Sequence, residues 1–318
     1  MDDTREHTMR ELKSLRARLE AMRKETGMAW EILEQDYALS WMLIGIAAVP
    51  RLKSTLIFKG GTALKKCFFG SYRFSQDLDF SVRGDGEHLL GDELFELLQN
   101  ACTYASEQLK KQNTFLQFRC QRYKERLPHP ENQEAFTVYV QFPWHSNQLT
   151  TRIMVEVTTR ERVLLEPLSR RIIHKYEEIN EDITIQTYPL EEIVAEKVRA
   201  ILQYAKKLHE RGWGRSRARD YYDLWRIFNE YTSQLNVKIL PELIDKKCEV
   251  KGVAFGSLDD LFSPTLMVDL DKAWQQWLEP IVPNLPSKEQ IVTELREMLS
   301  KTLDLSITGN RSKHSLHL

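Results

Sequence analysis

The stretch Phe58–Val82, FKGGTALKKCFFGSYRFSQDLDFSV, contains the features that decide the fold. A short apolar run, Leu56–Phe58, leads into a glycine turn at Gly60–Thr62, and Ala63–Phe69 then has the pattern of an amphipathic helix. Polar and apolar residues alternate across Asp77–Val82, as they do in a strand with one buried face. The expected order of elements is therefore strand, turn, helix and strand.

The two acids of the second expected strand, Asp77 and Asp79, are separated by one residue. Because successive strand side chains point to opposite faces, both carboxylates would share one face, about 6–7 Å apart. Such a pair repels itself unless a cation lies between its members. Oxygen ligands of this kind suit Mg²⁺ or Mn²⁺, and Mg²⁺ is usually bound by one or two carboxylates together with substrate phosphates. The paired acids therefore predict a divalent metal site.

The turn that precedes these acids has the composition of a phosphate-binding loop. Gly60 and Gly61 let the backbone approach a ligand closely, and Thr62 can cap the following helix, whose free N–H groups would attract an anion. Taken separately, such a turn can be a plain tight turn, and two alternating acids can be ordinary surface charge. Their occurrence in this order within one short stretch favours a nucleotide-binding site formed by Lys59, Gly60, Gly61 and Thr62.

These motifs resemble those of a known family. A glycine pair with Ser or Thr, a spacer and then DxD is similar to the signature of the DNA polymerase β-like nucleotidyltransferases. The form FKGGTALKK…YRFSQDLDF more specifically resembles the AbiEii/AbiGii family, the nucleotidyltransferase-like toxins of bacterial abortive-infection and toxin–antitoxin systems. The resemblance covers roughly residues 55–230 and is densest at Gly60–Phe80 and Glu196–Leu224.

The resemblance implies a function and partners. It implies an enzyme that moves a nucleoside monophosphate from an NTP to an acceptor, which would be an RNA such as the tRNA 3′ end or equally a protein. It also implies a cognate antitoxin encoded nearby and a bacterial cytoplasmic location. The N-terminus lacks a secretion signal, and the longest apolar run, Trp41–Pro50, is too short to span a bilayer, so no membrane association is expected.

Composition sets further limits on the chain of 318 residues. With 45 basic and 46 acidic residues the net charge is −1, so any nucleic-acid surface must be local. The four cysteines have no metal-ligand spacing and are expected to be reduced structural thiols.

Strands and helices alternate in a way that predicts an α/β (α+β) fold. Three further alternating runs, Phe115–Arg122, Phe136–Phe142 and Arg152–Thr158, predict a mixed or antiparallel sheet flanked by helices, as in the polymerase β-like palm. A strong helix begins at Leu190. We therefore expect a nucleotidyltransferase domain with N-terminal helices at residues 1–187 and a helical domain at 188–318, which would contribute Lys197 and Asp220 to the cleft.

The run Arg152–Thr158 contains a candidate third acid, Glu156, on the face opposite Val155 and Val157. A carboxylate in the middle of such a strand is costly if it is buried without a partner. It can be an edge-strand charge that faces water, or a third carboxylate beside the paired acids. The polymerase β-like superfamily places its third acid on such a strand, where it can bind a second metal or take the proton of the attacking hydroxyl.

Two residues of the helical half are also candidates. Lys197 lies four residues from Ile193 and from Ile201, on the apolar stripe of its helix, where it can extend toward water or face a phosphate in the cleft. The AbiEii-like proteins resemble this stretch, AEKVRA, and their lysine is functionally important. Asp220 can cap its helix, but RARDYYDL resembles the second hallmark of the family and assigns Asp220 to the active centre. Asp223 would orient a neighbour.

The segment HERGWGRSRAR is the best candidate for a phosphate or RNA contact, because its arginines flank an aromatic residue. The arginines are Arg211, Arg215, Arg217 and Arg219. Trp274 and Trp277, farther along the chain, are expected to be packing residues and not a base-stacking platform.

Two rival functions remain open for the acidic cluster. A metal-dependent nuclease would use similar carboxylates, but nucleases of the D…ExK type need a lysine two residues after the strand glutamate, and Thr158 stands there. The other rival is a non-catalytic protein that binds GTP or ATP and blocks a partner.

Overall fold

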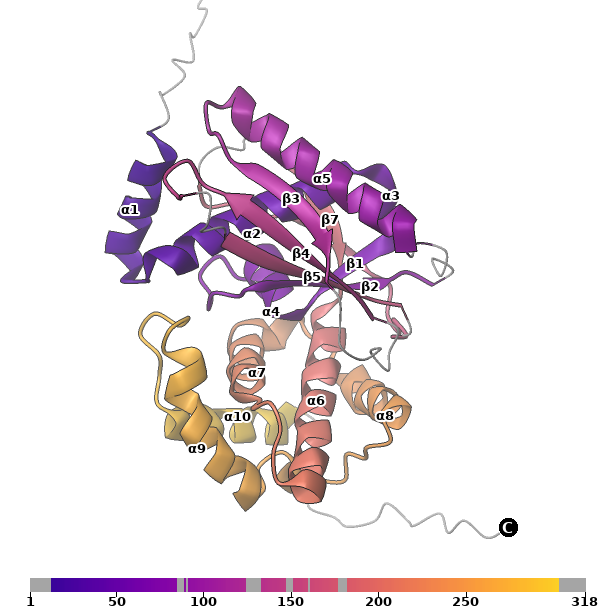
Figure 1. The fold of residues 1–318 in the computed structure, drawn as a ribbon. Coiled ribbons are helices and arrows are strands. Elements are labelled where there is room, and N and C mark those ends of the chain that lie inside the picture. Colours follow the sequence, from indigo (N-terminus) through magenta and orange to yellow (C-terminus); the bar gives the residue numbers. More distant parts are fainter. Residues whose placement is uncertain are drawn as a thin grey trace, which may run out of the picture. The chain divides into compact units, whose positions relative to one another are not determined.

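The computed structural model describes residues 13–84, 89, 91–123, 133–146, 151–159, 161–176 and 182–302. The chain divides into two compact units, which Figure 1 shows in sequence colours. The first comprises Met1–Tyr188 and Pro280–Pro283, and the second comprises Pro189–Glu279 and Asn284–Leu318. The short return of the chain into the first unit is fixed by a backbone hydrogen bond of 2.8 Å from Phe74 N to Ile281 O.

The first unit is built on a seven-stranded mixed sheet with the order β3-β4-β5-β2-β1-β7-β6. The β2–β5 and β1–β7 pairs are parallel, and the other neighbouring pairs are antiparallel. The expected mixed sheet flanked by helices is thus confirmed. The strands are β1 (Leu56–Lys59), β2 (Asp77–Val82), β3 (Gln117–Arg122), β4 (Gln133–Gln141), β5 (Thr151–Thr158), β6 (Leu168–Arg171) and β7 (Thr184–Thr187).

Two long helices of this unit, α2 (Trp30–Ala48) and α5 (Gly91–Lys111), pack against each other and against the sheet (Figure 1). Gly45 permits this packing, because a Cβ there would lie 3.0 Å from the backbone carbonyl carbon of Ala101 and closer still to its oxygen. The strand residues Leu78, Phe80 and Val155 are fully buried. The remaining helices are α1 (Leu15–Thr26), α3 (Pro50–Thr55), α4 (Gly60–Ala63) and the π-helix η1 (Leu64–Phe68).

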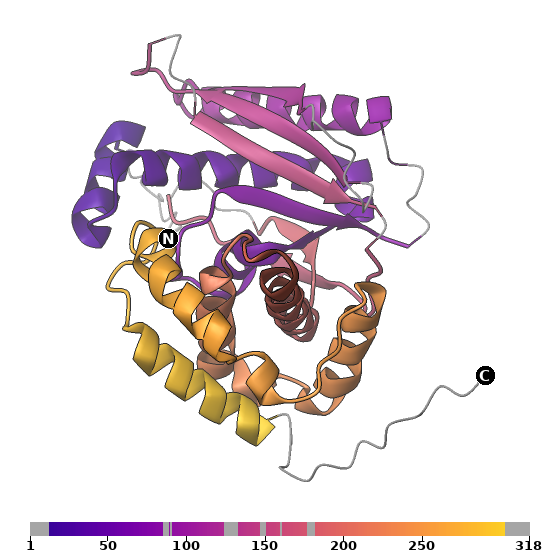
Figure 2. The same cartoon turned by 60° about the horizontal axis from the view of Figure 1, so that its bottom comes forward.

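The second unit is helical, as expected for this half of the chain. Its longest helix, α6 (Leu190–Arg211), is seen nearly end-on in Figure 2 and contacts α7, α8 and α9. Gly212 ends α6 in the left-handed conformation, at φ 75°, which glycine adopts without strain. The other helices are α7 (Ala218–Tyr231), α8 (Leu240–Val250), α9 (Pro264–Leu278) and α10 (Lys288–Thr302).

Two elements differ from the expectation. The segment Arg162–Thr187, which lies outside the runs whose alternation predicted strands, contains the short strands β6 and β7. Both are four residues long, and β7 is added to the sheet by parallel pairing with β1, whose Phe58 faces Thr187. A pairing between residues so far apart in sequence leaves little local pattern.

Within the part of the chain that the structure describes, each helix is too short or too polar to cross a membrane.

Candidate active site

The sheet brings three charged residues of the first unit into one row. On the antiparallel strands β1 and β2, Lys59 is the partner of Asp79. On the parallel strands β2 and β5, Asp79 is in turn the partner of Glu156. Cross-strand partners point to the same face, so three neighbouring strands present a cation and two carboxylates side by side. Asp77, two residues before Asp79, has its side chain on that face as well.

The glycine turn lies directly against one of these carboxylates. Gly60 has φ 77°, a conformation that strains any residue with a Cβ. A Cβ at this position would also lie 3.2 Å from Cγ of Asp79, and still closer to a carboxylate oxygen. Glycine is therefore required here on two counts, and the turn and the acid strand form one structure.

The hydroxyl of Thr62 has a different role from the expected one. Thr62 is the third residue of α4, and its Oγ1 donates a 2.5 Å hydrogen bond to the backbone oxygen of Asp77. At the N-cap of α4 stands Lys59, with no side-chain cap found there among the described residues, so the prediction that Thr62 caps this helix is wrong. Thr62 instead joins the turn to the first residue of β2.

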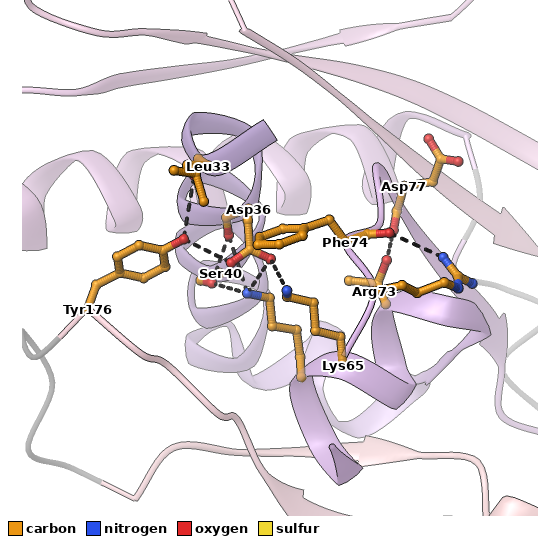
Figure 3. A network of polar contacts seen from close by, with 10 residues as sticks. Leu33, Asp36, Ser40, Lys65, Arg73, Phe74, Asp77 and Tyr176 are labelled. Carbon is orange, nitrogen blue, oxygen red and sulfur yellow. Dashed lines mark hydrogen bonds and ion pairs between the residues drawn. The ribbon is translucent and has the colours of Figure 1, made fainter. Parts of the chain in front are cut away.

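A buried arginine that the sequence did not point to packs on the other glycine of the turn. The guanidinium of Arg73 lies so close that a Cβ at Gly61 would be 2.9 Å from its Cζ. Nη1 of Arg73 donates to the backbone oxygen of Phe74 at 3.3 Å, and Figure 3 shows this group beside Asp77. Arg73 is 3% exposed, and its buried guanidinium packs against the backbone of the glycine turn.

The helix that follows the turn is buried on all sides, which corrects the expected amphipathic pattern of Ala63–Phe69. Its two lysines reach a single acid of α2, Asp36: Nζ of Lys65 lies 3.5 Å from Oδ1, and Nζ of Lys66 lies 2.9 Å from it. Tyr176 donates to Oδ2 of Asp36 at 2.9 Å, and Lys66 donates to Oγ of Ser40 at 2.7 Å (Figure 3). We call Asp36, Ser40, Lys65, Lys66 and Tyr176 the Asp36 cluster.

Burial and pairing shift the protonation of this cluster. Burial alone would raise the pKa of Asp36, but the charges of Lys65 and Lys66 and the hydrogen bonds from Lys66 and Tyr176 lower it to about 2. Burial lowers the pKa of Lys65 to about 8, against the attraction of Asp36, and the charge of Lys66 adds to this lowering. Nζ of Lys65 also lies 3.4 Å from the ring centroid of Phe74, so a cation–π contact offsets part of its lost hydration.

Lys59 itself is 8% exposed and forms an ion pair with Glu161, which follows β5. Its Nζ also lies 5.8 Å from the ring centroid of Tyr188. A single acid after a strand gives little sequence signal for this pairing. The pair fixes the lysine side chain at the end of β1, next to the acids of the row.

The second unit contains its own cluster. Nζ of Lys197, on α6, lies 3.0 Å from Oδ1 of Asp220 and 2.5 Å from Oδ2 of Asp223, both on α7. Lys197 and Asp223 are buried, and the side chain of Asp220 is 16% exposed. We call these three residues the Lys197 cluster. The ammonium of Lys197 is therefore buried between two carboxylates and does not extend to water, and Asp223 is one of the two groups that hold it.

A similar arrangement nearby serves as a comparison. Lys247, on α8, lies 2.7 Å from Glu192 and 3.1 Å from Glu196, which are both on α6. Lys247 and Glu192 are 4% and 0% exposed. One lysine between two acids is thus used twice in this unit, so the composition of the Lys197 cluster does not by itself identify a functional site.

The candidate arginines occupy different settings. Arg211 and Arg215 are exposed, Arg217 lies 3.6 Å from Oδ2 of Asp220, and Cζ of Arg219 lies 5.9 Å from the ring centroid of Trp277. Trp274 is buried and donates to the backbone oxygen of Pro286, as a packing residue should. Trp277 is 43% exposed, so it is less covered than Trp274.

The donor set of the acid row suits a divalent cation in part. Asp77 and Asp79 share a strand face, and Asp79 has Glu156 as its neighbour on the next strand. Across the described residues, no group of three His, Cys, Asp or Glu side chains is arranged to hold a metal ion. Asp77, Asp79 and Glu156 carry the oxygen ligands that Mg²⁺ prefers, and Mg²⁺ commonly takes further ligands from substrate phosphates.

The cysteines are buried free thiols. Burial raises the pKa of Cys67 and of Cys120 to about 12 and that of Cys248 to about 11, so these thiols are protonated and unreactive at neutral pH.

Comparison with known proteins identifies a family whose match spans parts of both units. The chain matches the family described as nucleotidyl transferase AbiEii toxin, type IV toxin–antitoxin system, over residues 42–301. No curated protein matches this chain by sequence.

Solved structures with a similar fold include the MenT4 nucleotidyltransferase toxin of Mycobacterium tuberculosis. It is 17% identical, with a TM-score of 0.61, over 93% of this chain and 91% of that chain. JHP933 of Helicobacter pylori is 17% identical, with a TM-score of 0.51, over 87% of this chain and 94% of that chain. At these identities the likeness concerns the fold. Because the family match covers most of the chain, including the glycine turn, the paired acids and Lys197, the chain is a nucleotidyltransferase that belongs to the AbiEii family of type IV toxin–antitoxin toxins.

Proposed function

We propose that this nucleotidyltransferase moves a nucleoside monophosphate from an NTP to an RNA acceptor, the 3′ end of a tRNA, and that its action is countered by an antitoxin encoded nearby. The observation that carries the proposal is the position of the glycine turn against Asp79, in the row that Asp79 forms with Lys59 and Glu156. A phosphate-binding turn and carboxylates within one structure suit a triphosphate and its metal.

The residues of the first unit divide the work. The turn Gly60–Thr62 and Lys59 bind the β- and γ-phosphates, while Asp77 and Asp79, with Glu156 beside them, hold Mg²⁺ or Mn²⁺. When bound, this ion neutralises charge that develops on the phosphates and aligns the reacting oxygens. The ion pair between Lys59 and Glu161 holds the lysine side chain in place at the end of β1.

The reaction forms one bond and breaks one. The acceptor hydroxyl oxygen bonds to the α-phosphorus, the bond from that phosphorus to the bridging β-phosphate oxygen breaks, and pyrophosphate leaves with the electron pair. Glu156 takes the proton of the hydroxyl. In the helical unit, Lys197 neutralises phosphate charge, and Asp220 and Asp223 hold its ammonium in position. The arginines at 211, 215, 217 and 219 contact the phosphates of the RNA.

A labelling experiment tests the proposal. The protein is incubated with Mg²⁺, each α-labelled NTP in turn and total RNA. Transfer of label to a tRNA-sized RNA supports the proposal. Transfer to protein would move the acceptor to another class. Shortening of the RNA without transfer would indicate a nuclease, and retention of NTP without turnover would indicate a sensor.

A matched pair of variants tests the site assignment. Asp79→Ala should lower transfer by at least about a hundredfold, the loss that removal of one charge-stabilising group commonly causes. Asp92→Ala removes an exposed acid of α5 that pairs with Arg122, and transfer should remain unchanged. Circular dichroism must show that both variants fold. If Asp79→Ala transfers label at a near wild-type rate, the acid row is not the active site.

A further inference from the structure

Two tryptophans of the helical unit are exposed beside arginines. Trp213 is 72% exposed, and Trp277 is 43% exposed. Cζ of Arg219 lies 5.9 Å from the ring centroid of Trp277, within the range of a cation–π contact. Exposed aromatic rings beside cations are the combination that proteins use to bind single-stranded nucleic acid.

The loop that carries Trp213 is held in place by the neighbouring helices. Gly214 packs on Tyr204 of α6, since a Cβ at Gly214 would lie 2.8 Å from ring atom Cε2. The hydroxyl of Tyr204 is hydrogen-bonded to Asp269 of α9, and the charge of Arg217 acts on the same hydroxyl. The loop is therefore tied to α9, the helix that also carries Trp277.

The arginine beside Trp277 is next in sequence to a member of the Lys197 cluster. Arg219 immediately precedes Asp220, whose carboxylate lies 3.0 Å from Nζ of Lys197. Arg217 is partly balanced by Asp220, at 3.6 Å, whereas Arg215 is exposed. A ligand on Trp277 would thus contact Arg219, the residue that directly precedes Asp220 of the Lys197 cluster.

We propose that Trp277, with Arg219, stacks a base of the single-stranded end of the acceptor RNA, and that Trp213 and Arg215 contact the adjoining nucleotides. This proposal rests on the proposed function and names the subsite for its acceptor. Bases that are not paired stack on aromatic rings and guanidinium planes, and sequence-tolerant binding to single strands combines such rings with cations. Two exposed rings and several arginines within one helical unit suit successive nucleotides of a strand, which favours an RNA strand over an NTP.

Binding measurements test this subsite without requiring turnover. A short, labelled single-stranded RNA is titrated with the full chain, and fluorescence anisotropy is recorded together with tryptophan emission. We expect binding with quenched emission, and Trp277→Ala should weaken binding about tenfold, as removal of one stacking ring does. Trp277→Phe, which retains a ring, should restore most of the affinity. The control is Val268→Ala on the same helix, which removes another exposed apolar side chain and should change nothing.

Three results would overturn the subsite. The first is that Trp277→Ala binds RNA as tightly as the wild type does. The second is that NTP alone quenches the tryptophan emission while RNA binding does not depend on Trp277. The third is that the wild type does not bind RNA. Thermal melts should show that the exposed-site variants fold normally. Failure of the subsite is distinguishable from failure of the proposed function. If Trp277→Ala transfers label with an unchanged KM for RNA, the proposed subsite is refuted and the proposed function is not. If RNA binding depends on Trp277 but no label is transferred, the proposed function is refuted and the subsite is not.

Discussion

The Asp36 cluster and the Lys197 cluster both bury lysine beside aspartate, but their compositions are opposite. In the first unit, one carboxylate is shared by two ammonium groups, at 3.5 and 2.9 Å. In the second, one ammonium is shared by two carboxylates, at 3.0 and 2.5 Å. The Asp36 cluster therefore has an excess positive charge, and the Lys197 cluster has an excess negative charge.

The difference teaches which group in each cluster is replaceable. Asp36 is the common partner of both lysines, so its loss would leave two buried charges without their acid. Lys197 holds the equivalent central place between Asp220 and Asp223. The outer members, Lys65 in one cluster and Asp220 in the other, are each one of two. In both units, replacing the central residue should therefore lower stability more than replacing an outer residue. Any contribution to catalysis comes in addition to this difference.

The largest effect is expected on transfer, from Lys197→Met. If Lys197 neutralises phosphate charge as proposed, its loss should lower transfer by at least about a hundredfold. Lys247→Met is the matched control, since Lys247 also lies between two acids, Glu192 and Glu196. Both variants should lose stability by a similar amount, and only the first should lose transfer. Label transfer per folded molecule measures this. Equal loss of transfer per folded molecule in both variants would show that the Lys197 cluster has a structural role only.

The next effect concerns stability and compares a central acid with an outer one. Asp36→Ala should lower the free energy of unfolding by about 3–5 kcal/mol, because Lys65 and Lys66 are left buried without a carboxylate. Asp223→Ala leaves Lys197 with Asp220 and should cost about 1–2 kcal/mol. Urea unfolding followed by circular dichroism measures both values. A smaller loss for Asp36→Ala than for Asp223→Ala would contradict the comparison.

The pH dependence of stability should reveal the excess positive charge of the Asp36 cluster. The pKa of Lys65 is about 8 in the folded chain against an ordinary value of 10.5, so the folded state binds fewer protons between these pH values. Stability of the wild type relative to Lys65→Met should therefore rise by about 3 kcal/mol as pH rises from 8 to 10.5, and be constant below that window. At the acid end, the contribution of Asp36, with its pKa of about 2, is present above pH 3.8 and is lost as pH falls through 2.

Unfolding midpoints of the wild type and Lys65→Met between pH 8 and 10.5 measure the first effect, and those of the wild type and Asp36→Ala between pH 3.8 and 2 measure the second. The reference variant matters because other groups that titrate above pH 8 then cancel. A difference that does not change with pH between 8 and 10.5 would show that Lys65 keeps its ordinary protonation in the folded chain.

Local periodicity was sufficient to predict the main strands of the sheet. Alternation predicted β2 with both acids on one face, and it predicted a strand around Glu156. The direct pairing of Asp79 with Glu156 depends on strand order, which the residues alone did not specify. The short strands β6 and β7 were missed because they acquire their place from β1 and from each other.

The charged clusters could be predicted less well, for a physical reason. Lys65 and Lys66 have the spacing of a solvent-exposed face, and their burial depends on Asp36, about 30 residues earlier in an apolar helix. An isolated acid in such a helix is the available signal, but it does not name its partner. Lys197 was recognisable because it interrupts the apolar stripe of α6, and its two acids lie close together in one motif. Pairing of charges across long sequence separations follows from packing and is not visible in periodicity.

The smallest effect is expected from an outer acid of the Lys197 cluster. Asp220→Asn keeps the shape of the side chain and leaves Lys197 paired with Asp223, and the Asp220 side chain is 16% exposed. Stability should fall by less than about 1 kcal/mol, as for other partly exposed ion pairs. Transfer should fall about tenfold, the loss typical of a residue that orients a catalytic group.

Transfer at saturating and at limiting NTP, together with urea unfolding, separates these contributions. An orienting role for Asp220 predicts that Asp220→Asn retains much more activity than Lys197→Met. If both variants are equally inactive while Asp220→Asn is stably folded, then Asp220 must itself contact the substrate or its metal. The two clusters would then differ in chemistry as well as in charge, because an outer residue of one would be as indispensable as its centre.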